Sequence, residues 1–300
     1  MVCQYPILLA HGIAPFDFLS RKIRKAFPSL AGSGDSRHYF KGVKSFLNSR
    51  GFEAHHGDVS FAASVDLRAR ELASQVEAIL KQPASPGRSH EKVLILAHSM
   101  GGLDARRMIV DFPGLAEKVA GLATIGTPHL GSSFADLGMQ KGGNLAILGL
   151  KKFVDLAGFA DLTTQACKVF NQRSLASEAA NGVVYHVWSS HEEKSRVYLP
   201  LRNSWSVIHE KEGANDGLVS VTSQEWASEL ALGNGARKTV KQFRFPFLAD
   251  HLNQIAWWSP KSPTLAGKLK EFVLAREFEK TVLEVYLEIA QNLAKDACPC

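Results

Sequence analysis

The sequence predicts an α/β fold in which helices cover both faces of a mostly parallel central sheet. Apolar runs of strand length alternate with amphipathic segments of helix length through the first half of the 300 residues. This alternation is typical of parallel sheets built from strand–helix–strand units. With 45% hydrophobic and 21% charged residues, the chain has the composition of a globular protein with a substantial core. We expect a single domain over residues 1–300.

The elements of the first half follow from periodicity and from turn residues. Strands and helices are expected in turn over residues 5–12, 38–51, 52–61 and 64–82. Pro83 and Pro86 end the last of these helices because proline cannot continue one. An apolar strand at 93–97 then runs directly into a helical pattern, and a further strand lies in "VAGLATIGTPHLGS".

The pattern changes at residues 132–181, where helical segments dominate. Residues 144–160 have a wide apolar face beside a narrow polar stripe. We therefore expect a helical lid or cap inserted at 132–181, with a permanently packed cap as the alternative to a mobile lid. A smaller polar and aromatic excursion is expected at 191–212. Strands resume around it, and one or two helices close the chain, over residues 183–190, 239–247 and 262–296.

Charge and composition exclude several classes of partner. The formal charge of +6 is too mild to indicate a nucleic-acid-binding protein, which would interleave basic and aromatic residues on one element. Segment 16–27 does mix three phenylalanines with arginines and lysines. A solvated helix face is the favoured interpretation, and transient contact with an anionic lipid surface is the alternative. No apolar run approaches the roughly 20 residues that span a bilayer.

The N-terminus and the cysteines bear on compartment and cofactors. The first residues, "MVCQYPILLAHG", lack a basic region and a cleavage site. We therefore expect no signal peptide, and a cytoplasmic location unless a leader has been removed. The four cysteines have no metal-ligand spacing. No cofactor is expected, and the chain is expected to be a monomer.

A serine ends the buried strand at 93–97. In "AHSMG", Ser99 has Ala97 two residues before it and Gly101 two residues after it. A nucleophilic serine on a sharp strand-to-helix turn needs small residues at both positions, because the two backbones crowd together there. A serine that only caps the helix is the alternative. The preceding strand and the following helical pattern favour the nucleophile.

A nucleophilic serine needs two backbone N–H groups for the developing oxyanion. One should come from Met100, the residue after the serine. The other should come from a loop after an early strand, where "HGI" stands at residues 11–13. Gly12 would let the backbone approach closely and leave the Ile13 N–H as the second donor. A plain strand-ending turn is the alternative for these residues.

The acid and base should follow the serine in the order carboxylate, then histidine. Among eleven histidines, His251 is favoured because it follows a strand and begins a helical pattern. Asp216, in the turn "ANDGLVSV", is the favoured acid, with an Asx-turn residue as the alternative. Other histidines and aspartates fit packing, solvent or salt-bridge roles, namely His11, His98, His129, His186, Asp104 and Asp250.

Six motifs together resemble the family I bacterial true lipases and their fungal triacylglycerol-lipase relatives. They are "LLAHGI", "AHSMGG", "TIGTPHLGS", "LTTQACKVFNQ", "NDGLVS" and "DHLNQI", between about residue 7 and residue 258. The common family pattern has glycine where Ala97 stands. The resemblance implies an α/β-hydrolase fold with a helical lid. It also implies Ser99 as nucleophile, Asp216 as acid, His251 as base, and Ile13 and Met100 as oxyanion donors.

One departure from the family concerns metal binding. Many bacterial members bind a structural calcium near the catalytic histidine, through a carboxylate two residues after it and a glutamine four residues further. Here these positions hold Asn253 and Trp257. Calcium prefers several oxygen ligands, and tryptophan offers none. The sequence therefore predicts no calcium site, and no cluster of zinc ligands is evident.

The expected function is hydrolysis of carboxylic esters, most simply of triacylglycerols, through a serine, histidine and aspartate triad and an acyl-enzyme. The substrate is then a lipid or another ester. An esterase, phospholipase or acyltransferase with the same residues is the first alternative, since a triad does not encode the acyl acceptor. A non-catalytic lipid-binding protein of the same fold is the second.

Overall fold

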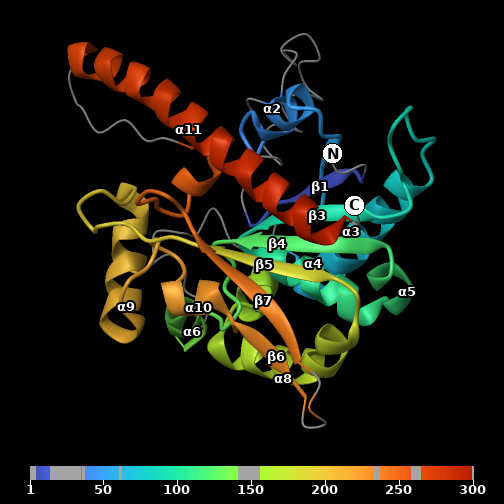
Figure 1. Cartoon of the computed structure of the whole chain (residues 1–300). Helices are drawn as coiled ribbons and strands as arrows, with labels where there is room; N and C mark the ends of the chain where they lie inside the picture. The colour runs from blue at the N-terminus through green and yellow to red at the C-terminus, as the bar shows by residue number, and fades with distance from the viewer. Residues whose placement is uncertain are drawn as a thin grey trace.

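The computed structural model describes residues 5–13, 35, 38–60, 63–140, 156–232, 235, 237–257 and 265–298, with the side chains of 156–157 and 265–273 left out. Segment 16–27 and most of the apolar segment at 144–160 lie outside the described residues. In the rest of the chain, helices surround a central sheet (Figure 1).

Seven strands form the sheet in the order β2-β1-β3-β4-β5-β7-β6. All neighbouring strands are parallel except β6 and β7, which are antiparallel. The predicted α/β fold with a mostly parallel sheet is therefore confirmed. The strands are β1 (Ile7–Ala10), β2 (Ala54–His56), β3 (Val93–His98), β4 (Val119–Ile125), β5 (Val184–Ser189), β6 (Glu229–Ala231) and β7 (Arg237–Arg244).

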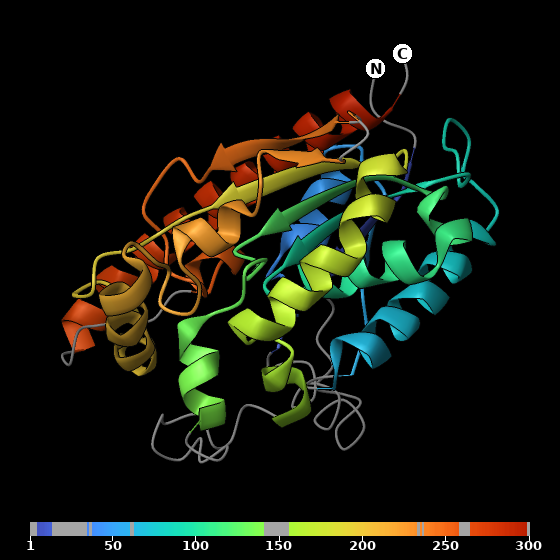
Figure 2. The same ribbon diagram turned by 90° about the horizontal axis from the view of Figure 1, so that it is seen from below.

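Helices lie on both faces of this sheet, as Figure 2 shows from below. Most of them are α-helices and two are short 3-10 helices, η3 and η4. They are α2 (Val43–Ser49), α3 (Val65–Leu80), α4 (Met100–Asp111), α5 (Pro113–Ala116), α6 (Ser133–Gln140), α7 (Leu156–Ala160), α8 (Thr164–Ala180), η3 (Leu199–Leu201), α9 (Arg202–Glu212), α10 (Val221–Glu225), η4 (Asn253–Ile255) and α11 (Leu265–Ala297).

The two-residue period of each strand divides the core into two layers. Leu94 and Leu96 of β3 point to the layer that α2 and α11 cover. Ile95 and Ala97 point to the opposite layer, which contains the buried faces of α3 and α4. Both layers are apolar because helices cover both faces, so the strand itself is a continuous apolar run.

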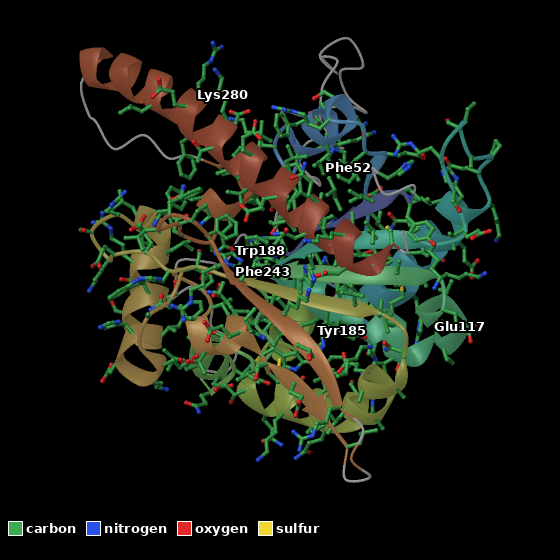
Figure 3. The ribbon with its side chains drawn as sticks, viewed as in Figure 1. Phe52, Glu117, Tyr185, Trp188, Phe243 and Lys280 are labelled. Atoms are coloured by element: carbon green, nitrogen blue, oxygen red, sulfur yellow. The ribbon has the colours of Figure 1, made fainter. Side chains whose placement is uncertain are left out.

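Helix α11 runs across one face of the sheet (Figure 1). Its buried side chains join those of β3 and β4 in one apolar cluster. Trp188 of β5 and Phe243 of β7 lie beside each other on this face (Figure 3), with stacked rings 4.6 Å apart. Where the sequence leaves one or two C-terminal helices open, the structure has a single helix of 33 residues.

Several elements escaped the sequence analysis. The excursion expected at 191–212 contains the 11-residue helix α9, whose polar surface and single buried apolar residue, Ile208, give a weak periodic pattern. The short strand β6 and helices α5 and α10 have three to five residues each. Segments of that length carry too few residues to show a period. Among the described residues, no helix is both long and apolar enough to cross a membrane.

A buried ion pair joins helix α4 to helix α8. The guanidinium of Arg106 donates to both carboxylate oxygens of Glu178 at 2.7 and 2.9 Å, and both side chains are almost completely buried. Arg106 also donates to Asn171 at 2.8 Å and lies 3.7 Å from the ring centre of Trp226. These contacts fix the helix that follows Ser99 against the end of the 132–181 segment.

We expect Glu178→Ala to lower the free energy of unfolding by about 3 to 5 kcal/mol, because the Arg106 charge then stays buried without its partner. Urea titration measures the change. Glu229→Ala is the matched control, since the Arg237–Glu229 pair is exposed and its loss should cost less than about 1 kcal/mol. Equal losses from the two variants would contradict the assigned role of the buried pair.

Candidate active site

Ser99 occupies a strained turn between β3 and α4. Its backbone angles are φ 56° and ψ −135°, a conformation that L-residues rarely adopt. The Ser99 N–H donates to the carbonyl of Ile125 at 2.9 Å. The Thr127 hydroxyl donates to the carbonyl of Ser99 at 2.8 Å. These two bonds from the neighbouring strand and its loop hold the turn in place.

Small residues are required around this turn. A Cβ atom on Gly101 would lie 2.4 Å from the carbonyl oxygen of Ala10, and one on Gly102 would lie 2.2 Å from the hydroxyl of Thr127. Ala97, which stands where the common family pattern has glycine, is fully buried within β3. The sequence thus places its smallest residues where β1, β3 and α4 come closest.

His251 and Asp216 complete a hydrogen-bonded row that starts at Ser99. His251 Nε2 lies 2.8 Å from Ser99 Oγ, and His251 Nδ1 lies 2.7 Å from Asp216 Oδ2. Because an ionised carboxylate only accepts, Nδ1 carries the proton and Nε2 is free to accept the serine hydroxyl. The structure thus brings together the three residues that the sequence singled out.

Backbone contacts position both partners of Ser99. The His251 N–H donates to the carbonyl of Asp216 at 2.9 Å, which ties the two loops together. Asp216 Oδ1 accepts the N–H groups of Leu218 and Val219 at 2.9 and 2.8 Å. Asp216 is therefore both an Asx-turn residue and the partner of His251, so the two roles coexist. The carboxylate is fully buried.

The loop after β1 lies against the serine. A Cβ atom on Gly12 would be 2.6 Å from Ser99 Cβ and 3.0 Å from Ser99 Oγ, so only glycine fits there. Ile13 follows, and its side chain packs on a cluster that includes Met100 and Leu103. Met100 is the first residue of α4, so its N–H has no partner within the helix. Met100 thus follows Ser99 directly, and Ile13 follows the glycine that is pressed against Ser99.

Arg68 of α3 holds the loop after β1 in place. The sequence analysis did not single it out. Arg68 donates to the carbonyls of His11 and Ser60 at 2.6 and 2.7 Å and pairs with Asp104 at 2.7 Å. Arg68 and Asp104 are both almost fully buried. Its position could have indicated burial, because Arg68 stands three residues after Val65, on the apolar side of the predicted helix.

Asp104 lies in a salt bridge and does not face solvent, which decides between the two roles left open by the sequence. Burial raises the pKa of its carboxyl to about 6, and the Arg68 guanidinium counteracts that rise only in part. One oxygen, Oδ1, has no hydrogen-bond partner although it is buried.

The other candidate residues have structural partners. The carboxylate of Asp250 accepts the backbone N–H groups of Leu252 and Asn253, which caps the turn at His251, and that of Tyr198, which joins this turn to the segment before η3. His186 is buried and bonds to Asp296 at 2.8 Å. His129 contacts Arg106 and Thr124, and its pKa lies well below the usual value because it is buried. His11 Nδ1 contacts the carbonyl of Gly12 at 2.8 Å.

The residues at the family's calcium positions bond to each other and to the chain. The Asn253 side chain donates to the carbonyl of Trp257, and the Trp257 indole donates to the carbonyl of Tyr39, both at 2.9 Å. Within the described part of the chain, no group of three or more histidine, cysteine, aspartate or glutamate side chains could hold a metal ion.

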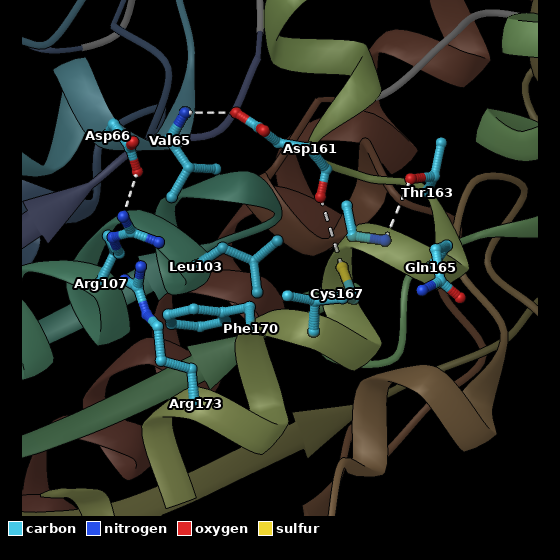
Figure 4. Close-up of a pocket in the computed structure, with 12 residues that line it drawn as sticks. Val65, Asp66, Leu103, Arg107, Asp161, Thr163, Gln165, Cys167, Phe170 and Arg173 are labelled. Carbon is cyan, nitrogen blue, oxygen red and sulfur yellow. Dashed lines mark hydrogen bonds and ion pairs between the residues drawn. The ribbon is translucent and has the colours of Figure 1, made fainter.

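A cavity of about 420 Å³ opens between α3, α4 and α8 (Figure 4). Leu103 and Cys167 line it, and both belong to the apolar cluster that contains Met100 and Ile13. Charged residues, among them Arg107 and Asp66, pair with each other at its edge. The cavity thus has an apolar wall, continuous with the cluster of Met100 and Ile13, and polar side chains around it.

Sequence comparisons identify relatives of this chain. Residues 54–140 match the model of the PGAP1-like alpha/beta domain family. A triacylglycerol lipase of Vibrio cholerae is 30% identical over 252 residues, which cover 73% of each chain. Triacylglycerol lipase 2 of Saccharomyces cerevisiae is 29% identical over 259 residues, 86% of this chain and 73% of that protein.

Solved structures share the fold. A metagenomic carboxyl esterase superposes with a TM-score of 0.65 at 15% identity and covers 99% of this chain and 77% of its own. At that identity the likeness concerns the fold alone, which is that of the α/β-hydrolases.

The raised pKa of Asp104 predicts a pH dependence of stability. Folding raises the pKa from 3.8 to about 6, so between these values the folded chain holds a proton that the unfolded chain has released. Stability from this group is therefore lost as the pH rises. Relative to Asp104→Asn, wild type should lose on the order of 2 kcal/mol of unfolding free energy between about pH 4 and pH 7. Urea titrations at both pH values measure the difference, and parallel pH curves would contradict it.

Proposed function

We propose, since this chain belongs to the triacylglycerol lipase family and is an ester hydrolase of the α/β-hydrolase fold, that Ser99, His251 and Asp216 form its catalytic triad. The observation that carries the proposal is the pair of hydrogen bonds from His251, 2.8 Å to Ser99 and 2.7 Å to Asp216. The strained turn at Ser99 and the glycine pressed against it support the same assignment.

The mechanism is acyl transfer in two steps. The Ser99 hydroxyl attacks the ester carbonyl carbon while its proton moves to His251 Nε2. The carbonyl oxygen becomes an oxyanion, for which the N–H groups of Met100 and Ile13 are the donors. His251 then gives its proton to the departing alcohol as the carbon–oxygen bond breaks, which leaves an acyl-enzyme. Water, deprotonated by the same imidazole, attacks the acyl carbon. The bond between that carbon and Ser99 Oγ then breaks, Ser99 takes the proton back from His251, and the carboxylic acid is released.

Asp216 assists by holding the imidazole in one tautomer. The carboxylate accepts the proton on His251 Nδ1 and stabilises the imidazolium that forms during each step. Because Asp216 also accepts two backbone N–H groups, it cannot rotate without losing both. These two bonds help to hold the carboxylate, and so to keep Nε2 directed at the serine.

The substrate we propose is a triacylglycerol. The relatives from Saccharomyces cerevisiae and Vibrio cholerae are named triacylglycerol lipases. The apolar wall of the cavity, which belongs to the same cluster as Met100, suits an acyl chain. Helices α6, α7 and α8 occupy the 132–181 segment. We propose that the chain is a single domain in which this segment is an inserted cap over the site, with its end held to α4 by the Arg106–Glu178 pair.

Ser99→Ala should lower the rate of hydrolysis by at least about a thousandfold on both tributyrin and emulsified triolein. The reason is that no other hydroxyl replaces the nucleophile. The partly buried Ser206 on α9, far along the chain from this turn, provides the control variant Ser206→Ala, which should retain the wild-type rate. Unchanged hydrolysis by Ser99→Ala would refute the triad, and cleavage of short esters alone by wild type would replace the lipase assignment with an esterase.

Ala166→Trp tests the cavity. Ala166 lines it from α8, so an indole ring there fills space meant for a long acyl chain. We expect hydrolysis of p-nitrophenyl palmitate to fall by about tenfold, the loss associated with roughly one to two displaced methylene contacts. Hydrolysis of p-nitrophenyl butyrate by the same variant is the internal control and should change less than about twofold. Equal losses on both esters would show that acyl chains do not use this cavity.

A further inference from the structure

A buried row of hydrogen bonds connects Asp216 to Tyr39 by way of His98, the last residue of β3. The Gln254 amide donates to Asp216 Oδ2 at 2.9 Å. The Gln254 carbonyl lies 2.9 Å from His98 Nε2, and His98 Nδ1 lies 2.7 Å from the hydroxyl of Tyr39. His98 directly precedes Ser99, and Gln254 lies one helical turn after His251. None of these contacts is needed to explain the triad itself.

Neighbouring groups fix the direction of every donor in this row. The Ser190 hydroxyl gives its proton to the carbonyl of Ala249 at 2.7 Å, so towards Gln254 it accepts at 2.9 Å. Both protons of the Gln254 amide are therefore used, on Ser190 and on Asp216, and the Gln254 oxygen must point at His98. His98 then carries its proton on Nε2, and Nδ1 accepts from Tyr39. All donors point towards Asp216.

Burial makes any other arrangement of these hydrogen bonds costly. Gln254 and His98 are completely buried and Tyr39 is 3% exposed, so an unpaired group in the row would be costly. His98 stays neutral because burial and the neighbouring His251 lower its pKa well below the usual value. Gly126 leaves the space for Gln254, since a Cβ atom there would lie 2.1 Å from the Gln254 oxygen.

Tyr39 connects the row to the loop after β1. Its hydroxyl would lie 2.8 Å from a Cβ atom on Gly12, the residue pressed against Ser99. The Trp257 indole holds the Tyr39 carbonyl at 2.9 Å. One connected set of hydrogen bonds thus joins the loop of His251, the residue before the nucleophile and the residue that packs beside the oxyanion loop.

We propose that Gln254, His98 and Tyr39 are positioning residues that act as one unit, orienting Asp216 through a directional row of hydrogen bonds that ends on its carboxylate. The inference rests on the proposed function, because it assigns Asp216 to the triad. If Tyr39 loses its hydroxyl, His98 Nδ1 loses its donor in a buried place, so the ring can shift and its bond to the Gln254 oxygen weakens. Gln254 is then held less firmly against Asp216, and the carboxylate loses part of its fixed orientation.

The test is a double-mutant cycle on kcat for p-nitrophenyl butyrate. Gln254→Met keeps the volume but cannot donate, and kcat should fall by about tenfold with KM changed less than about twofold. Tyr39→Phe removes only a hydroxyl, and kcat should fall by about fivefold. The double variant should be no slower than Gln254→Met alone, because residues that act through one another are not additive. Gln254→Asn replaces Gln254→Met if the latter does not fold.

Tyr185→Phe is the matched control for Tyr39→Phe. Tyr185 is buried like Tyr39 and its hydroxyl accepts from Asn181 at 2.9 Å, but it bonds neither to the triad nor to the row. Tyr185→Phe should lower the melting temperature without lowering kcat. A wild-type kcat for Gln254→Met, multiplicative losses in the double variant, or a loss of kcat in Tyr185→Phe equal to that in Tyr39→Phe would each overturn the inference.

The inference and the proposed function fail in different ways. Hydrolysis by Ser99→Ala at the wild-type rate would remove the triad, and the positioning role with it. An inactive Ser99→Ala together with a fully active Gln254→Met would leave the triad intact and remove only the positioning role.

Discussion

The turn at Ser99 brings the backbones of β1, of the loop after β1 and of α4 close together, and the surrounding structure depends on that closeness. β1 lies so near to α4 that Gly101 has no room for a side chain, and the loop after β1 lies so near to Ser99 that Gly12 has none either. Strain at Ser99 persists because hydrogen bonds from the neighbouring strand and its loop hold it. The same closeness presses Gly12, the residue before Ile13, against Ser99.

Buried charges hold the helices around this turn. Arg68 joins α3 and α4 to the loop after β1, while Arg106 joins α4 to α8. Each guanidinium has a carboxylate partner and further acceptors, which a buried charge requires. A planar group with five donors can satisfy several carbonyls and a carboxylate at once, so arginine suits these positions better than lysine.

Hydrogen bonds within the chain organise the loop of His251. Asp250 caps the loop through three backbone N–H groups, and Asn253 and Trp257 fasten it to itself and to Tyr39. Asn253 and Trp257 stand at the positions for which the resemblance implies calcium ligands. Their side chains donate hydrogen bonds in this chain and help to hold the loop.

The sequence by itself determined the alternation of strands and helices, the small residues around Ser99, and the order of Ser99, Asp216 and His251, because these depend on local spacing. It left the role of Asp104 undecided, assigned the His98 side chain to packing, and gave no reason to select Gln254 or Tyr39. Their roles depend on partners 36 to 156 residues away in the chain. Only the tertiary structure decides such pairings, since a buried polar group takes its function from whichever donor or acceptor the fold brings to it.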